Sequence, residues 1–307
     1  MSLLETKHLI GLRDLSYNDI RHLLDTAKSF REILDRPIKK VPSLRGLTVV
    51  NLFFENSTRT RISFELAEKR LSADTVNFSS SSSSLKKGES LLDTVRNIES
   101  MKIDLAVVRH STTGVPQFLA DNTNLTILNA GDGAHEHPTQ GLLDMLSLET
   151  AFGDLKGRKI SIIGDVLHSR VARSNIWGLV TLGADVTVYG PSTLLPKDIS
   201  GFPIKIASSL EEVVRGADAL MCLRLQRERQ DKALLSSERE YRENFGVTAS
   251  RIEKWNPEVK IMHPGPVNRN IELDSTVVDS QNSLILNQVT NGVAVRMSAL
   301  YLLGGGK

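Results

Sequence analysis

The stretch LTVVNLFFENSTRTRISFELAEKRL, residues 47–71, places an apolar run, a polar turn and a helix-like segment in direct succession. Its first part, Leu47–Phe54, is rich in β-branched and aromatic residues and is typical of a buried strand. In its last part, Arg61–Leu71, one helical face carries Phe64, Ala67 and Leu71. Strands followed by helices build parallel sheets, so this stretch predicts an α/β fold.

The same alternation continues along the chain. Further strand candidates, mostly separated by helix-like segments, are Ile103–Arg109, Leu125–Asn129, Lys159–Gly164, Asp185–Tyr189, Ala219–Leu223 and Val259–Met262. The chain has 307 residues, which exceeds the usual size of a single hydrophobic core. We therefore expect two similar lobes, each a parallel sheet flanked by helices, with an active site in the cleft between them.

The boundary between the lobes is expected at a short linker near Phe152–Asp154, which follows the helix-like segment Pro138–Thr150. This division gives domains of residues 1–150 and 151–288. The last helix, about residues 289–307, is apolar enough to pack back on the first domain.

A weak internal echo links the two halves. The triplet Leu44-Arg45-Gly46 precedes one strand, and Leu155-Lys156-Gly157 precedes another. The residues thirteen positions after the two glycines are Arg59 and Arg170, each preceded by a hydroxyl residue at a predicted strand-to-helix turn. Ligands of open α/β sheets collect at such turns, so both arginines are candidates for anion contact, although coincidence also explains the echo.

Composition excludes several classes of function. Lys and Arg number 38 against 36 for Asp and Glu, which gives no basic field for nucleic acid. No apolar run is long enough to span a bilayer, and the N-terminus lacks the pattern of a signal peptide. The only cysteine, Cys222, lies in an apolar run and suits a reducing cytoplasm. We expect a cytoplasmic protein with neither nucleic acid nor membrane as partner.

The turn at residues 55–61 is a candidate phosphate site. Backbone N–H groups at the start of a helix bind anions, and Ser57, Thr58 and Thr60 add hydroxyl donors. Arg59 supplies a guanidinium group that matches phosphate oxygens, and Arg61 is a further candidate for the same contact. The alternative is a helix cap with two solvated arginines. Neither a Walker loop nor a GxGxxG turn is present, so we expect a small phosphorylated molecule and no nucleotide cofactor.

Residues 53–61, FFENSTRTR, resemble the carbamoyl phosphate signature of the aspartate and ornithine carbamoyltransferases. Three more segments resemble this family in order and approximate spacing, namely Val108–His110, His137–Gln140 and His263–Pro266. The resemblance runs from about residue 8 to residue 303. It implies that the first domain binds carbamoyl phosphate and that the second binds the amine acceptor.

The resemblance also implies residue roles. The carbamoyl phosphate site would comprise Ser57, Thr58, Arg59, Thr60, Arg109, His137, Gln140, Gly265 and Pro266. His137, Thr60 and Arg109 would polarise the carbonyl oxygen, where negative charge develops during transfer. The backbone of Gly265 and Pro266, together with Gln140, would hold the carbamoyl NH2.

A metal site is the alternative for the histidines. His135 and His137 alternate and could share one face of a strand, but zinc needs at least one more ligand. His110, Asp132 or His263 could be proposed, although no spacing marks a third ligand. We expect no metal and no cofactor.

The acceptor site is expected in the second domain. Arg170 and Arg224 suit the two carboxylates of L-aspartate, because a guanidinium matches a carboxylate in shape and charge. The resemblance implies that Arg170 contacts the α-carboxylate side and Arg224 the β-carboxylate, and that Gln226 assists. Arg224 directly follows an apolar strand, whereas a solvated loop explains the neighbouring charges at Arg227, Arg229, Lys232, Arg239 and Arg242.

The serine-rich run Ser79–Ser84 reads as a flexible loop, but the segment that follows includes Lys87-Gly88-Glu89. In the family a Ser-x-x-x-Lys-Gly-Glu loop enters the site of a neighbouring subunit, which places Ser83 and Lys87 there. The resemblance therefore implies a homotrimer with shared active sites, which could be part of a larger assembly. Lys87 would act in catalysis and in aspartate binding.

Together with these residues, the resemblance implies transfer of the carbamoyl group of carbamoyl phosphate to the amine of L-aspartate. The products would be N-carbamoyl-L-aspartate and phosphate, and the resemblance places this reaction in de novo pyrimidine (UMP) biosynthesis. Two alternatives stay open. Ornithine is the competing acceptor, although Lys87 and Arg224 would repel its second ammonium. The chain could also be a non-catalytic protein that binds a phosphorylated metabolite.

Overall fold

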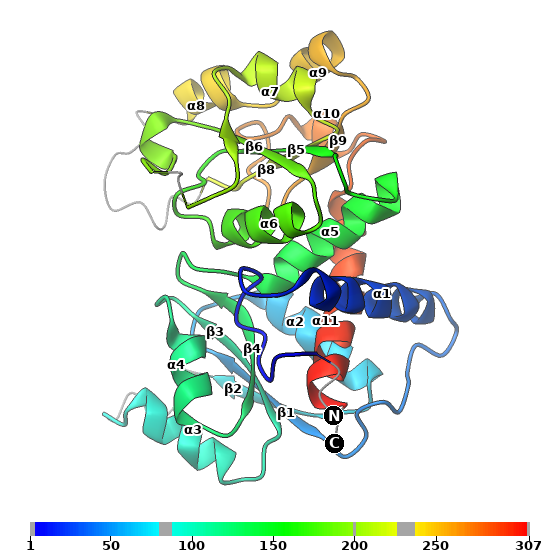
Figure 1. Ribbon diagram of the computed structural model, residues 1–307, viewed down its shortest axis with the longest axis vertical. Helices are drawn as coiled ribbons and strands as arrows, with labels where there is room; N and C mark the ends of the chain where they lie inside the picture. The colour runs from blue at the N-terminus through cyan, green and yellow to red at the C-terminus, as the bar shows by residue number, and fades with distance from the viewer. Residues whose placement is uncertain (1–3, 80–87, 199–200, 226–236, 306–307) are drawn as a thin grey trace. The chain divides into compact units, whose positions relative to one another are not determined.

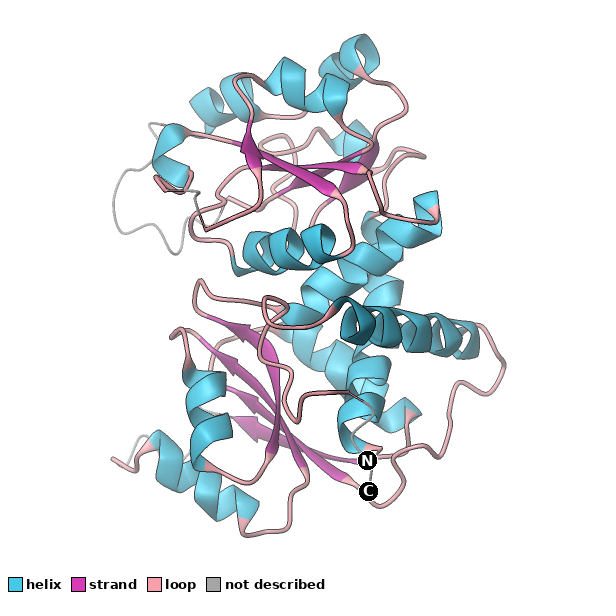
Figure 2. Ribbon diagram, in the orientation of Figure 1, coloured by secondary structure: helices cyan, strands magenta, loops and turns pink. Residues whose placement is uncertain are grey.

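The computed structural model describes residues 4–79, 88–198, 201–225 and 237–305 (Figure 1). The chain divides into two compact units: unit 1 comprises Met1–Leu146 with Thr290–Lys307, and unit 2 comprises Ser147–Val289. Each unit contains a parallel sheet with helices on both of its sides (Figure 2), so the expected α/β fold is confirmed. The unit boundaries fall inside two helices, α5 (Pro138–Phe152) and α11 (Ile285–Gly304).

Unit 1 has a four-stranded sheet in the order β2-β1-β3-β4. Its strands are β1 (Thr48–Phe53), β2 (Asp74–Ser79), β3 (Leu105–His110) and β4 (Thr126–Asp132). Its own helices are α1 (Tyr17–Leu34), α2 (Thr58–Arg70), α3 (Leu91–Glu99) and α4 (Val115–Asn122). Alternate residues of a strand point to opposite faces, and Val50 and Leu52 pack with Val95 of α3 and Leu119 of α4. Asn51 points to the other face, toward α2.

Unit 2 has a five-stranded parallel sheet in the order β7-β6-β5-β8-β9. Its strands are β5 (Lys159–Ile163), β6 (Asp185–Tyr189), β7 (Lys205–Ile206), β8 (Ala219–Cys222) and β9 (Lys260–Met262). Its helices are α6 (Arg170–Thr181), α7 (Leu210–Gly216), α8 (Glu238–Phe245), α9 (Ala249–Trp255) and α10 (Ser275–Val278), with a short 3-10 turn η3 (Ser192–Leu194). Figure 1 shows α6 on one side of this sheet and α7, α8 and α9 on the other.

The expected strands are all present, within a few residues at their ends. The sequence did not predict β2 and β7, which lie at sheet edges. The helix predicted from residue 61 begins at Thr58, and the last helix begins at Ile285 instead of residue 289. The chain enters unit 2 within α5, a few residues before the expected linker.

The internal echo corresponds to two equivalent turns. Leu47 N donates to Leu44 O at 3.1 Å before β1, and Arg158 N donates to Leu155 O at 3.0 Å before β5. The third residue of each turn is a glycine with positive φ, 85° at Gly46 and 71° at Gly157. Glycine adopts this conformation without strain, which explains its presence in both turns.

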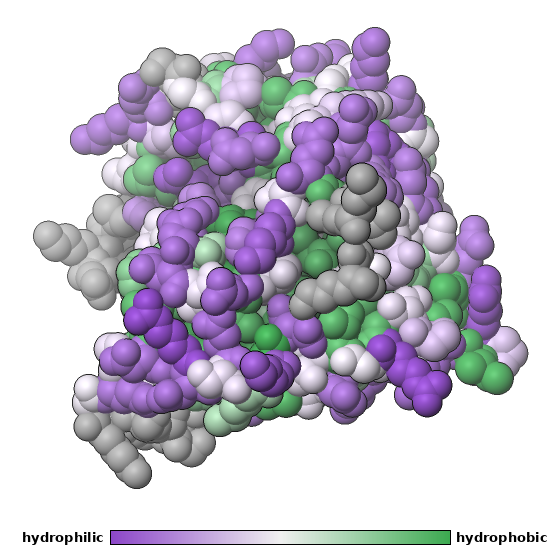
Figure 3. All heavy atoms as spheres, turned by 60° about the horizontal axis from the view of Figure 1, so that its bottom comes forward, coloured by the Kyte–Doolittle hydropathy of each residue, from purple (hydrophilic) through white to green (hydrophobic). Residues whose placement is uncertain are grey.

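The surface in Figure 3 mixes hydrophilic residues with smaller hydrophobic areas. Large exposed apolar side chains of unit 1 include Tyr17, Ile38, Ile62, Leu66, Met101 and Phe118. In the described part of the chain, no helix combines the length and apolar character needed to cross a membrane.

Candidate functional site

The phosphate loop of unit 1 lies where the strand order changes direction. From β1 the chain continues through α2 to β2 on one side, whereas β3 pairs with β1 on the other side. The register pairs Phe53, at the end of β1, with Arg109, near the end of β3. Ligands of open parallel sheets bind outside the carboxyl ends of strands at such a point. The fold thus brings Arg109 beside the loop that precedes α2.

The start of α2 is suited to an anion. Ser57 is the N-cap residue, but its side chain makes no capping hydrogen bond, and the first turn contains no acidic residue. By contrast, the N-cap serines of α1, α3 and α6 each accept a hydrogen bond from a helix N–H. Thr58 and Arg59 are exposed, and Thr60 is half-buried. The Ser57 side chain therefore does not cap the helix, which is the alternative that the sequence left open for this turn.

Arg61 and Arg109 differ in their surroundings. The Arg61 guanidinium lies 3.7 Å from Glu65 on the outer surface of α2. Arg109 is 9% exposed, donates from Nη1 to Ala130 O at 3.0 Å, and lies 3.5 Å from the Glu55 carboxylate. Contacts to both the loop and β4 restrict the Arg109 side chain, which is the preorganisation that an anion site needs.

His137 stands at the start of α5 and is 4% exposed. Its carbonyl accepts hydrogen bonds from Gln140 N at 2.9 Å and Gly141 N at 3.2 Å, so the first turn of the helix fixes its backbone. The Gln140 side chain donates from Nε2 to Asp144 Oδ1 at 2.9 Å. The oxygen of the Gln140 amide is therefore the end suited to accept from an NH2 group.

Asp132, at the end of β4, organises the loop that leads to His137. Its carboxylate accepts hydrogen bonds from Gly114 N at 2.7 Å and Asn129 Nδ2 at 2.8 Å, and it lies 3.1 Å from His135 Nδ1. Burial opposes ionisation, but these hydrogen bonds dominate and lower the pKa of Asp132. The sequence suggested Asp132 and His135 only as metal ligands, whereas the structure pairs them with each other.

Unit 2 repeats the arrangement of unit 1. Strand β5 lies between β6 and β8, and the register pairs Ile163 with Cys222 at their carboxyl ends. Arg170 is the first residue of α6, after the β5 turn, and is 4% exposed. Arg224 follows β8 and is half-buried. The order of strands thus places both arginines at the change of direction of this sheet, which is again where ligands bind.

Gly265 and Pro266 lie in the loop after β9, within unit 2. Gly265 has φ 64° and donates from its backbone N to His263 Nδ1 at 2.8 Å. Glu272, which the sequence did not single out, accepts hydrogen bonds from Leu225 N at 2.7 Å and Asn268 N at 2.9 Å. It therefore joins this loop to the segment that carries Arg224.

Three expected site residues, Ser83, Lys87 and Gln226, lie outside the described residues, as do Arg227, Arg229 and Lys232. Among the residues that are described, no three His, Cys, Asp or Glu side chains are grouped so that they could hold a metal ion. Cys222 is buried, and burial raises the pKa of its thiol.

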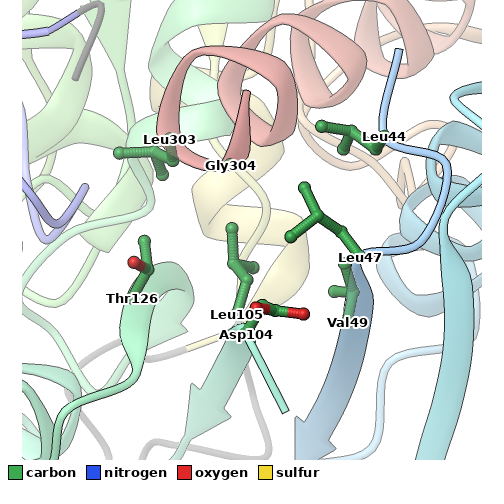
Figure 4. Close-up of a pocket in the computed structure, with 8 residues that line it drawn as sticks. All are labelled: Leu44, Leu47, Val49, Asp104, Leu105, Thr126, Leu303 and Gly304. Atoms are coloured by element: carbon green, nitrogen blue, oxygen red, sulfur yellow. The ribbon is translucent and has the colours of Figure 1, made fainter. Parts of the chain in front are cut away.

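A small cavity lies away from the candidate residues, at the other ends of the strands of unit 1 (Figure 4). It is lined by the apolar side chains of Leu44, Leu47, Val49, Leu105 and Leu303, together with Asp104, Thr126 and Gly304. Asp104 Oδ2 accepts a hydrogen bond from Thr48 N at 3.0 Å, so its carboxylate has a structural task.

Two family descriptions match the chain in succession. Residues 7–150 match "Aspartate/ornithine carbamoyltransferase, carbamoyl-P binding domain", and residues 156–303 match "Aspartate/ornithine carbamoyltransferase, Asp/Orn binding domain". The aspartate carbamoyltransferase catalytic subunit of Gemmatimonas aurantiaca is 59% identical over 98% of this chain and 94% of that protein. The corresponding subunit of Cytophaga hutchinsonii is 54% identical over the full length of both chains.

Solved structures agree with these matches. Aspartate transcarbamoylase from Trypanosoma cruzi in complex with carbamoyl phosphate has a TM-score of 0.87 at 31% identity, covering 98% of this chain and 97% of that one. The catalytic subunit of aspartate transcarbamoylase from M. jannaschii has a TM-score of 0.83 at 34% identity, covering 97% of this chain and 98% of that one.

Proposed function

Since the chain belongs to the aspartate/ornithine carbamoyltransferase family, we propose that it is a catalytic chain of aspartate carbamoyltransferase. It transfers the carbamoyl group of carbamoyl phosphate to the amine of L-aspartate, and the products are N-carbamoyl-L-aspartate and phosphate. This reaction belongs to de novo pyrimidine biosynthesis. The observation that carries the proposal is that both sheets place arginines at the point where their strand order changes direction.

In this proposal the carbamoyl phosphate domain is the one that holds the start of α2. The phosphate accepts hydrogen bonds from the first N–H groups of the helix and from Ser57, Thr58, Arg59 and Thr60. The uncapped Ser57 and the lack of an acidic residue in this turn support the assignment. Arg109 and His137, which are both buried, polarise the carbonyl oxygen. Gln140, with the backbone of Gly265 and Pro266, accepts from the carbamoyl NH2.

The aspartate domain is the one that contains Arg170 and Arg224. Aspartate carries two carboxylates, and each arginine can bind one of them through two N–H groups. Gln226 assists, and Lys87 adds a positive charge. Two guanidinium groups favour a dicarboxylic acceptor over ornithine, whose side chain ends in an ammonium. The curated relatives carry the name of the aspartate enzyme, which supports the same choice.

The chemistry requires positioning and charge stabilisation. The neutral amine of aspartate attacks the carbonyl carbon, and a C–N bond forms while negative charge develops on the carbonyl oxygen. His137, Thr60 and Arg109 stabilise that charge. The C–O bond to phosphate then breaks, Arg59 and the α2 N–H groups stabilise the departing phosphate, and the phosphate accepts the proton from the amine. Most of the rate enhancement comes from holding the reactants in place.

We also propose a cytoplasmic homotrimer in which Ser83 and Lys87 act in a neighbouring subunit. Support for an interface comes from α2, where Ile62 and Leu66 are 49% and 39% exposed and lie four residues apart on one helical face. Exposed apolar side chains of this kind are typical of surfaces that become buried on association. In the sequence, Ser83 and Lys87 follow β2 within eight residues of its end.

An assay that measures both products tests the function. Purified protein is incubated with carbamoyl phosphate and aspartate, and both phosphate and N-carbamoyl-L-aspartate are measured. We expect equal amounts of the two products, competition between succinate and aspartate, and no effect of ornithine. Carbamoylation of ornithine would contradict the roles of Arg170 and Arg224. If carbamoyl phosphate binds but no product forms with either amine, the chain is a binding protein instead.

A further inference from the structure

The outer edge of β4 is paired with the amino-terminal segment His8–Arg13. Leu9 N donates to Ile127 O, and Asn129 N donates to Leu9 O, both at 2.9 Å. Ile127 N also donates to His8 Nδ1 at 3.1 Å. Burial and the nearby Lys7 lower the pKa of His8, so its ring stays neutral and can accept this hydrogen bond. The segment therefore lies along the last strand of the unit 1 sheet.

The same segment ends at a buried carboxylate. Glu136 is 1% exposed, and its two oxygens accept hydrogen bonds from Leu12 N at 2.7 Å and Arg13 N at 3.3 Å. A buried carboxylate needs such donors, and an ionised acceptor strengthens each hydrogen bond. The side chain of the residue that directly precedes His137 is thus bound to backbone from the beginning of the chain.

The backbone of Glu136 is fixed as well. Its N–H donates to Asp132 Oδ1 at 3.3 Å, and its carbonyl accepts from Asp132 N at 3.2 Å. Asn129 Nδ2 adds hydrogen bonds to Ile10 O at 2.8 Å and to the Glu136 carbonyl at 3.3 Å. Glu136 therefore connects the edge strand β4 and the amino-terminal segment to the loop before α5.

We propose that Glu136 is a positioning residue, which fixes His137 by binding the amino-terminal segment at Leu12 and Arg13. The inference rests on the proposed function, because it concerns the group that polarises the carbonyl. The segment His8–Arg13 contains none of the proposed substrate-binding residues, but through this contact it would affect catalysis. A displacement of about 1 Å in a catalytic group can cost on the order of 100-fold in rate, so a fixed His137 backbone matters.

Gly11 allows the same contact to be disturbed from its other side. A Cβ atom on Gly11 would lie 2.4 Å from Glu136 Oε1 and 2.8 Å from its Cδ, so the carboxylate would have to move. Gly11 does not have a φ in the left-handed region, so its backbone conformation does not in itself require glycine. Gly216, at the end of α7, is the matched control, because a Cβ there meets no atom within 4 Å.

The experiment uses full-length Glu136→Gln, Gly11→Ala, their combination and Gly216→Ala. Glutamine presents an NH2 group to a backbone N–H, and this loses one hydrogen bond at nearly constant size. We expect kcat to fall about 10- to 100-fold in Glu136→Gln and in Gly11→Ala, with Gly216→Ala unchanged. Inorganic phosphate should bind all four proteins with the wild-type Kd, because the phosphate contacts lie at α2.

The double variant decides between positioning and general destabilisation. Both substitutions disturb one contact, so the double variant should be no slower than the slower single variant. Losses of kcat that multiply, or a wild-type kcat in Glu136→Gln, would overturn the proposal. Loss of phosphate binding together with kcat would also overturn it, because the defect would then extend to the whole unit. An inactive wild-type protein would instead contradict the proposed function, so the two failures are distinguishable.

Discussion

Three buried carboxylates, on Asp132, Glu136 and Glu272, accept hydrogen bonds from backbone N–H groups of segments far away in the sequence. Each lies in or beside a loop that follows a strand, where backbone groups have no neighbouring strand to pair with. An ionised acceptor can satisfy two such N–H groups at once. These residues therefore keep irregular loops rigid beside the proposed substrate groups.

Arg59 gives the most direct test of the phosphate loop. In Arg59→Ala, a charged donor to the phosphate is lost in the ground state and in the transition state, and we expect kcat/KM for carbamoyl phosphate to fall about 100- to 1000-fold. The control is Lys69→Ala, which removes one positive charge from the exposed last turn of the same helix. Steady-state kinetics on both proteins measures the difference. A near-normal Arg59→Ala enzyme would show that this turn is only a helix cap.

Because of the buried carboxyl of Glu68, we expect the stability of the folded protein to depend on pH. It is fully buried in α2 and accepts from Asn51 Nδ2 at 3.0 Å, and burial raises its pKa from 4.5 to about 7. The folded state thus favours the protonated carboxyl. Protonated Glu68 therefore makes its full contribution to the free energy of unfolding below pH 4.5. This contribution, about 3 kcal/mol, is lost as the pH rises through 7.

Urea unfolding of wild type and Glu68→Gln at pH 5.5 and pH 8.5 measures this contribution. The neutral amide cannot ionise, so we expect the variant to gain stability relative to wild type at the higher pH. Glu32→Gln, which changes an exposed carboxylate of α1, is the control and should show a much smaller difference. An equal difference at both pH values would mean that Glu68 does not titrate in this range.

The sequence could point to the proposed substrate groups, through residue types at a predicted turn and through the motifs of the resemblance, but not to the residues that support them. Arg59, Arg109 and His137 stand in short local motifs, each beside a predicted strand or helix. Glu136 also lies in such a motif, but its partners Leu12 and Arg13 are more than 120 positions away. Backbone partners leave no mark on residue type, so one sequence cannot reveal them. Glu272 escaped prediction for the same reason.

At the scale of elements, hydrophobic patterning located the strands whose residues are largely buried, which include the edge strands β4 and β9. Strand β1, for example, reads from Val49 to Phe53 as an apolar run interrupted only by Asn51. The edge strand β2 contains Asp74, Thr75 and Asn77 and leads into the serine run, so its composition resembles a loop. Strand β7 has only two residues, Lys205 and Ile206, both exposed. Hydrophobic patterning cannot detect strands that bury so little.

The end of α11 allows a test of packing beside the small cavity, which lies at the amino-terminal ends of β1 and β3. A Cβ on Gly304, the last residue of the helix, would lie 3.4 Å from Leu47 and 3.5 Å from Leu44, at ordinary contact distance. Alanine also loses less backbone entropy than glycine on folding. We expect Gly304→Ala to stabilise the protein by about 0.5–1 kcal/mol.

The neighbouring glycine is the matched comparison. A Cβ on Gly305 would lie 2.6 Å from the carbonyl oxygen of Tyr301, so Gly305→Ala should destabilise the protein. The midpoint of urea unfolding reports both changes. Shifts of the same sign in the two variants would show that the packing around this helix end does not control them.

At the scale of the whole molecule, the proposed trimer predicts complementation between two inactive proteins. Arg59→Ala should damage a subunit's own phosphate site, whereas Lys87→Ala should damage the site of its neighbour. When the two proteins are unfolded together and reassembled, some sites combine an intact Arg59 with an intact Lys87. We expect activity to return in these mixed trimers. Inactive mixed trimers, identified by mass, would show that Lys87 serves its own subunit.

Unit 1 is discontinuous in sequence, because Thr290–Lys307 belongs with Met1–Leu146. This segment supplies buried side chains such as Ala294, Met297, Leu300 and Leu302. On the ribosome these residues are made after all of Ser147–Val289, so the continuous unit 2 can fold while unit 1 still lacks part of its core. Synthesis therefore begins with unit 1, but the core of unit 2 becomes complete first. A nascent chain that stalls before residue 290 would expose the interior of unit 1 to chaperones and proteases.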